Sequence, residues 1–285
     1  MIKIIDVTVR DGLQSFKKVI SHDKRSKIVN LISSLGISHL EVGSIVSNNL
    51  IPQMKESIEV YKLCNIYNNK NCYYMLASNY EGIKEMMIND VRHICFFTSP
   101  SDEFNKRNIN RNTEDSFKRI EFLKSKISNN AYTRGYLSCI TECPYEGEIP
   151  LNKIIKSIEK FDKMNVDDIA LSDTLGTINY EKFKNILDNL NPEILKKISI
   201  HLHQSDDSWK KIVDLCLSYG INRFDTSILN LGGCPAAFSE NKKKSGNLNL
   251  FDFITYLDEN KIMHNVNKSE IRNVEKTVSK ILNQE

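Results

Sequence analysis

The sequence predicts an α/β fold, a (β/α)8 TIM barrel with a C-terminal helical extension. Eight short runs rich in β-branched residues alternate with amphipathic segments along the 285 residues, which is the element count of a closed parallel barrel. A doubly wound open sheet is the rival fold, but the chain has no glycine-rich phosphate loop of the kind such sheets carry. No Gly-, Ser- or Pro-rich linker divides the chain. We therefore expect one catalytic domain over residues 1–285, with the barrel in about 1–257 and the extension in about 258–285.

Strands and helices are predicted from hydrophobic periodicity. The first helix illustrates the signals, because Ser21 is a good N-cap and Gly36 a good terminator. The predicted strands are Ile2–Val9, His39–Val42, Cys72–Leu76, His93–Phe97, Thr133–Ile140, Asp168–Leu171, Ile198–Leu202 and Arg223–Thr226. The other predicted helices are Met54–Cys64, Tyr80–Ile88, one from near Thr113, Leu151–Met164, Tyr180–Leu190, Ser208–Tyr219 and one after Asn267.

Composition narrows the classes of partner and the compartment. The net charge of +3 comes from 39 basic and 36 acidic residues spread along the chain, so the sequence predicts neither a nucleic-acid partner nor a membrane surface. No run reaches transmembrane length, and the N-terminus lacks the features of a signal peptide. Seven scattered cysteines do not predict a disulfide framework. We expect a cytoplasmic protein.

Two histidines end the predicted strand Ile198–Leu202, in the stretch I-S-I-H-L-H-Q. Residues two apart on a strand share a face, so His201 and His203 are expected to point the same way. Such a pair could hold a divalent metal. The alternative is a pair of structural, hydrogen-bonded histidines.

In a TIM barrel the active site lies at the C-terminal ends of the strands. Asp11, His201, His203 and Asn247 could meet there and offer two nitrogens, a carboxylate and an amide oxygen. This mixed set suits Mg²⁺ or Mn²⁺, and Zn²⁺ is also compatible. Other polar residues at strand ends or in the loops after them are Arg10, Glu41, Arg134, Cys139 and Asp173.

Several motifs resemble those of the metal-dependent TIM-barrel lyases and synthases, and most closely 3-hydroxy-3-methylglutaryl-CoA (HMG-CoA) lyase. D-G-L-Q, C-P-Y-E-G and G-G-C-P together are more specific to the lyase than R-D-G alone, which the whole superfamily shares. The motifs are T-V-R-D-G-L-Q at Thr8–Gln14, E-V-G-S-I-V-S-N-N-L-I-P-Q-M at Glu41–Met54, N-K-R-N-I-N at Asn105–Asn110, R-G-Y-L-S-C at Arg134–Cys139, C-P-Y-E-G at Cys143–Gly147, the H-L-H pair, G-G-C-P and S-G-N.

The resemblance implies a role for each matching residue. The substrate would be an acyl-CoA, cleaved to acetoacetate and acetyl-CoA as in leucine degradation and ketone-body formation, and we expect a homodimer. Arg10 would stabilise the developing negative charge, Glu41 would orient Arg10, and Cys234 would protonate the product enolate from a mobile loop. The implied metal ligands are Asp11, His201, His203 and Asn247, and the implied substrate-binding residues are Arg10, Gln14, Ser44, Arg134 and Asp173.

The chain also departs from the family pattern. Gln204 stands where the family has Asp, Ala170 where it has Ser, and Phe251 where it has an acidic residue; the loop from Cys234 to Asn247 is longer. These changes leave every implied metal ligand in place but alter its surroundings. Two alternatives therefore stay open: a 2-oxo acid aldolase or acyl-CoA synthase of the same superfamily, and a barrel that binds an acyl-CoA without turnover.

Overall fold

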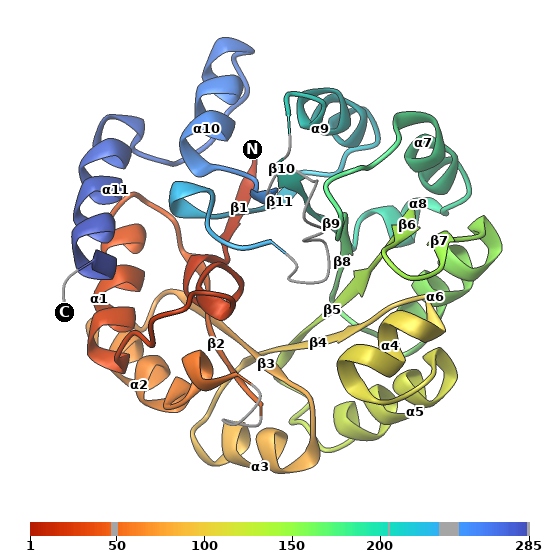
Figure 1. Ribbon diagram of the computed structural model, residues 1–285, viewed down its shortest axis with the longest axis horizontal. Coiled ribbons are helices and arrows are strands. Elements are labelled where there is room, and N and C mark those ends of the chain that lie inside the picture. The colour runs from red at the N-terminus through yellow and green to blue at the C-terminus, as the bar shows by residue number, and fades with distance from the viewer. Residues whose placement is uncertain (47–50, 205, 234–244, 284–285) are drawn as a thin grey trace.

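Eight parallel strands close into a barrel in the computed structural model, which describes residues 1–46, 51–204, 206–233 and 245–283 (Figure 1). The last barrel strand pairs back onto the first, and every barrel pair is parallel. The predicted TIM-barrel fold is confirmed. The barrel strands are β1 (Lys3–Asp6), β2 (His39–Ile45), β3 (Cys72–Ala77), β4 (His93–Thr98), β5 (Tyr132–Ser138), β8 (Asp168–Ser172), β9 (Ile198–His201) and β11 (Arg223–Thr226).

Helices form a ring around the strands (Figure 1). Ser21 caps the first helix as predicted, since its side chain accepts the backbone N–H of Lys24. The last helix, α11, packs against α1 and α10. The helices are α1 (His22–Ser33), α2 (Ser57–Tyr67), α3 (Tyr80–Ile88), α4 (Asp102–Ile109), α5 (Thr113–Lys124), α6 (Leu151–Lys163), α7 (Tyr180–Asp188), α8 (Pro192–Leu195), α9 (Trp209–Ser218), α10 (Leu250–Glu259) and α11 (Lys268–Asn283).

Three of these helices, α4, α8 and α10, were not predicted. In α4 only Phe104 and Asn105 are buried, so its apolar periodicity is weak. The helix α8 is only four residues long. Within the described residues, no helix combines the length and apolar content needed to cross a membrane.

Strand ends differ from the sequence prediction at the mouth of the barrel. The first strand stops at Asp6 and gives way to a π-helical turn, η1 (Thr8–Gly12). The fifth stops at Ser138, because Cys139 has a left-handed backbone with φ of 60°. The seventh stops at His201, and its continuation leaves the barrel as β10 (His203–Gln204), paired antiparallel with β12 (Gly246–Asn247). A second small pair joins β6 (Glu142–Cys143) to β7 (Gly147–Glu148).

The core has two layers, because side chains alternate between the two faces of each strand. On β3, Tyr73 and Met75 belong to the large cluster between strands and helices, whereas Tyr74 and Leu76 belong to a smaller cluster inside the barrel. The inner cluster also includes Cys95, Tyr136 and Ala170.

Candidate active site

A π-helical turn carries Arg10 and Asp11 to the mouth of the barrel. The amide of Gly12 donates to the carbonyl of Val7 at 3.0 Å, which closes the wide ring of this turn. Asp6 anchors the start, because its carboxylate accepts the amide of Thr8 at 3.0 Å and the Thr8 hydroxyl at 2.8 Å. Two adjacent polar side chains thus line one cavity.

Asp11, His201 and His203 form a compact cluster. Each offers one ligand atom, and these atoms lie within 4.8 Å of one another. Nδ1 of His203 is 3.0 Å from the carbonyl oxygen of Thr174. A carbonyl only accepts, so Nδ1 carries the proton and Nε2 keeps its lone pair. His201 has the same arrangement, with Nδ1 at 3.0 Å from the carboxylate of Asp225.

Two unpartnered atoms test whether this cluster fits a cation. Nε2 of His203 and Oδ1 of Asn247 are buried and have no hydrogen-bond partner among the described residues. Nδ2 of Asn247 donates to Asp11 and to the carbonyl of Leu231, both at 2.9 Å, which fixes the amide orientation. Leaving such a group unpaired costs ~1–3 kcal/mol. A bound cation would satisfy both atoms, so Asp11, His201, His203 and Asn247 fit a divalent metal.

Arg10 is held between two carboxylates. Its Nη1 is 2.7 Å from Asp11 and its Nη2 is 2.8 Å from Glu41, whose side chain is 0% exposed. The guanidinium carbon lies 5.0 Å from the centre of the Tyr136 ring. These contacts fix the plane of the guanidinium beside the metal cluster.

Charge states in the cluster suit cation binding. Burial acts to raise the pKa of Asp11, but Arg10, His201 and His203 together lower it to about 2. Burial and the neighbouring His201 lower the pKa of His203 to about 4. At neutral pH, Asp11 is therefore ionised and His203 is neutral, which are the forms that bind a metal.

A cavity of about 630 Å³ opens beside the cluster. It lies at the C-terminal ends of the strands, as the fold requires, and its volume is typical of small-molecule sites. Of the residues expected from the sequence, it is lined by Arg10, Asp11, Gln14, Ser44, His201 and His203.

Basic side chains line the same cavity. They are Lys106, Arg107, Arg111 and Arg119. Arg119 donates to the carbonyl of Ser78 at 3.0 Å, and burial together with nearby Arg111 lowers its pKa. Four cations around one cavity favour an anionic ligand.

Two expected substrate-binding residues have other neighbours. Arg134 has a side chain 0% exposed, with Nη2 at 2.6 Å from Asp225 and 3.0 Å from Ser199 inside the barrel. The carboxylate of Asp173 is buried and accepts two backbone amides of the loop that follows it, and burial raises its pKa to about 6. Neither is among the described residues that line the cavity, so the geometry does not support direct substrate contact. Cys234 lies outside the described residues.

Two residues of the site were not predicted from the sequence. Asp225 and Tyr136 lie inside the barrel. Asp225 contacts His201 directly, and Tyr136 contacts Asp225 and Glu41, the carboxylate that pairs with Arg10. Signals for both existed in the sequence. Tyr136 lies inside the quoted R-G-Y-L-S-C motif, and Asp225 is a carboxylate in the middle of a predicted buried strand.

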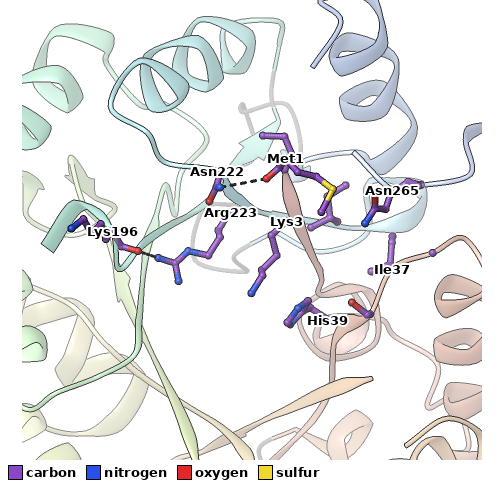
Figure 2. A pocket seen from close by; sticks show the side chains of 13 residues that line it. Met1, Lys3, Ile37, His39, Lys196, Asn222, Arg223 and Asn265 are labelled. Atoms are coloured by element: carbon purple, nitrogen blue, oxygen red, sulfur yellow. Dashed lines mark hydrogen bonds between the residues drawn. The ribbon is translucent and has the colours of Figure 1, made fainter. Parts of the chain in front are cut away.

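A second cavity, of about 400 Å³, lies at the opposite end of the barrel (Figure 2). Its residues Lys3, His39 and Arg223 begin their strands. Figure 2 shows the guanidinium of Arg223 reaching the carbonyl of Lys196, and the amide of Asn222 reaching the carbonyl of Met1. These contacts join chain segments at the N-terminal end of the barrel, the end that contributes to stability in this fold. The candidate active site is therefore the cavity at the C-terminal mouth.

Comparisons with known proteins identify the family of this chain. The HMGL-like family model matches residues 1–278. The human mitochondrial hydroxymethylglutaryl-CoA lyase is 33% identical over 259 residues, which cover 90% of this chain and 78% of that protein. The human cytoplasmic 3-hydroxy-3-methylglutaryl-CoA lyase is also 33% identical, over 90% of this chain and 69% of that protein. The crystal structure of hydroxymethylglutaryl-CoA lyase from Pseudomonas aeruginosa superposes with a TM-score of 0.91 at 26% identity, covering 100% of this chain and 94% of the other.

Proposed function

This chain belongs to the HMGL-like family and is a carbon–carbon lyase, and we propose that it cleaves HMG-CoA to acetoacetate and acetyl-CoA with the help of a divalent metal. The observation that carries the proposal is the meeting of unpartnered ligand atoms and a fixed guanidinium at one cavity. We assign the activity to a single catalytic domain over residues 1–285.

We assign the metal to Asp11, His201, His203 and Asn247, and Mg²⁺ or Mn²⁺ to the site. The unpaired Nε2 of His203 and Oδ1 of Asn247 support this ligand set. When bound, the ion would polarise the substrate oxygens and offset negative charge that develops on them.

The bond cleavage is a retro-Claisen step. A base removes the proton of the C3 hydroxyl, the bond from C3 to the carbon next to the thioester breaks, and its electron pair passes into the enolate of acetyl-CoA. The C3 oxygen becomes the ketone of acetoacetate. Arg10, whose guanidinium is held in orientation by Asp11 and Glu41, stabilises the charge on the reacting oxygens. Cys234 then delivers a proton to the enolate carbon.

The acyl-CoA would lie along the cavity. Gln14 and Ser44 line it together with Arg10, and we assign them to the acyl end. Arg111 and Arg119 also line the cavity, without a carboxylate partner among the described residues, and suit the phosphates of coenzyme A. We further propose a homodimer. We propose a cytoplasmic location, and the six described cysteines, all free thiols, are consistent with it.

A coupled assay tests the proposal. Purified protein is given HMG-CoA with Mg²⁺, with Mn²⁺ or with a chelator, and acetoacetate and acetyl-CoA are measured separately. We expect equal release of both products, only with metal. A panel of 2-oxo acid aldol substrates serves as the contrast. Turnover of these substrates without cleavage of HMG-CoA would assign the chain to the aldolase branch instead.

A further inference from the structure

We propose that Asp225 is a positioning residue that joins the metal ligand His201 to Arg10 through one buried hydrogen-bond network. The inference rests on the proposed metal site. It concerns residues from four strands, β2, β5, β9 and β11, and the π-helical turn after β1.

Asp225 binds partners through both oxygens. Oδ2 is 3.0 Å from Nδ1 of His201, and Oδ1 is 2.6 Å from Nη2 of Arg134. The carboxylate only accepts, so it holds the proton of His201 on Nδ1 and leaves Nε2 facing the cluster. A carboxylate behind a metal-binding histidine fixes the ring orientation in this way.

The hydroxyl of Tyr136 bridges two carboxylates. It lies 2.8 Å from Oε2 of Glu41 and 3.1 Å from Oδ2 of Asp225. The hydroxyl has one proton, which it shares between the two acceptor oxygens, with the shorter contact to Glu41. The same Glu41 oxygen is 2.8 Å from Nη2 of Arg10. His201 and Arg10 are thereby connected through three side chains.

Charge balance explains why the network can be buried. Glu41 and Asp225 are each about 1% exposed, and a buried carboxylate requires a counter-charge. Arg10 supplies it for Glu41, and Arg134 supplies it for Asp225. Arg134 is itself held by Asp168, with Nε at 3.3 Å from the carboxylate. Arg134, which was expected to bind the substrate, therefore has a structural role as the counter-charge of the buried carboxylates of Asp225 and Asp168.

The network couples the orientation of a metal ligand to the support of Arg10. A shift of Asp225 changes the orientation of a metal ligand and, through Tyr136 and Glu41, the support of the guanidinium. Tyr136 contributes its hydroxyl to this network, and its ring also packs against both guanidinium groups, 5.0 Å from Arg10 and 4.7 Å from Arg134.

Three variants test the coupling. Asp225→Asn replaces an acceptor oxygen with a donor, Tyr136→Phe removes only the bridging hydroxyl, and Tyr74→Phe is the matched control. Tyr74 belongs to the same interior cluster, but its hydroxyl bonds to Nδ1 of His39, outside the network. Mn²⁺ affinity is measured by calorimetry, the His201 tautomer by ¹⁵N NMR of the metal-free protein, and kcat and KM with HMG-CoA.

We expect Asp225→Asn to bind Mn²⁺ ~10–100-fold more weakly and to lose the Nδ1–H tautomer of His201. Tyr136→Phe should keep its Mn²⁺ affinity and KM but lose ~10-fold or more in kcat, because only the support of Arg10 is loosened. Tyr74→Phe should match the wild type in all three measurements.

Unchanged Mn²⁺ affinity in folded Asp225→Asn, or a kcat of Tyr136→Phe equal to that of Tyr74→Phe, would overturn the coupling. If Asp225→Asn does not fold, Tyr136→Phe decides. A wild type that binds no Mn²⁺ would refute the metal site and this inference together. A wild type that binds Mn²⁺ but does not cleave HMG-CoA would refute only the proposed substrate. Mn²⁺ affinity and the His201 tautomer would still decide the role of Asp225.

Discussion

His203 and Asn247 lie opposite each other in the antiparallel pair of β10 and β12. Each keeps one buried ligand atom, Nε2 and Oδ1 respectively, without a hydrogen-bond partner among the described residues. A pairing of two residues per strand, outside the barrel, therefore supplies half of the proposed metal ligands.

Replacing His203 with Ala should abolish binding of Mn²⁺ and catalysis while the barrel stays folded, because a ligand at the mouth supports function more than the core. Calorimetry with Mn²⁺ and circular dichroism measure the two effects. His22→Ala, which removes a half-buried histidine that is paired with Glu56 and does not line the cavity, is the control. Undiminished Mn²⁺ affinity in His203→Ala would remove it from the ligand set.

Arg10→Lys should keep the charge but lose the planar fork that bridges Asp11 and Glu41. We expect kcat to fall by ~2–4 orders of magnitude with a much smaller change in KM, because the lost interaction forms fully only in the transition state. Steady-state kinetics with HMG-CoA measure this split. Arg92→Lys, at an exposed pair with Asp90, is the control and should leave kcat and KM unchanged. Near-normal turnover in Arg10→Lys would contradict the assigned role.

Gly232 leaves room for the metal site. Its φ is 109°, and a Cβ there would lie 2.3 Å from Nδ2 of Asn247 and 3.0 Å from Oδ2 of Asp11. Gly232→Ala should therefore displace both side chains and weaken Mn²⁺ binding. Gly220→Ala is the matched control, because Gly220 has a φ of 77° with nothing within 4 Å of the added Cβ. Both variants should lose ~1–2 kcal/mol of stability from the left-handed backbone, and equal Mn²⁺ affinity in the two would argue against the displacement.

Histidines at the other end of the barrel should make stability depend on pH. Burial and nearby Lys3 lower the pKa of His39 and His93 from 6.5 to about 4. Between those values the unfolded chain binds protons that the folded histidines do not, so the contribution of these two histidines to the free energy of unfolding should fall as the pH drops from 6.5 to 4. Burial raises the pKa of Asp6 to about 7 and that of Asp173 to about 6, and these carboxyls act in the opposite direction.

A variant separates the histidine contribution from the carboxyl contribution. Urea unfolding of the wild type and His93→Gln is compared at pH 7 and pH 5. The variant should lose less stability on acidification than the wild type. The slopes of their unfolding free energies against pH should differ by the equivalent of up to about one bound proton. An identical pH dependence in both proteins would show that His93 is not neutral in the folded state.

Cys234 should be the thiol whose modification inactivates the enzyme. Cys95 and Cys216 are buried, and burial raises the pKa of each thiol, so both should react slowly. Cys143 is the more demanding comparison, because a hydrogen bond from Cys139 lowers its pKa to about 5 although it is buried. Mass mapping after partial inactivation, with and without a substrate analogue, measures the order of labelling.

The variants Cys234→Ser and Cys143→Ser complete that test. Cys234→Ser should lose most of kcat and become insensitive to the reagent. Cys143→Ser should keep both its activity and its sensitivity. The reverse result would make Cys234 a spectator, and the proton donor would then be sought elsewhere in the site.

Local patterns determined the fold class of this protein. The apolar alternation of the strands and the cap at Ser21 act within a few residues, and the sequence shows both. The sequence also shows which residue types form the metal cluster. Asp11, His201 and His203 follow predicted strands, and parallel strands bring their carboxyl ends to one rim.

Only the tertiary structure decided how the side chains inside the barrel meet. Whether Arg134 reaches the substrate or a buried carboxylate depends on strand register, which pairs it with Cys95 on one side and Asp168 on the other. The π-helical turn at Arg10 and the pairing of His203 with Asn247 likewise depend on contacts between distant parts of the chain. The hydrophobic periodicity of a strand predicts which face a residue occupies. Which residue it contacts on that face depends on the strand register and on how the barrel closes.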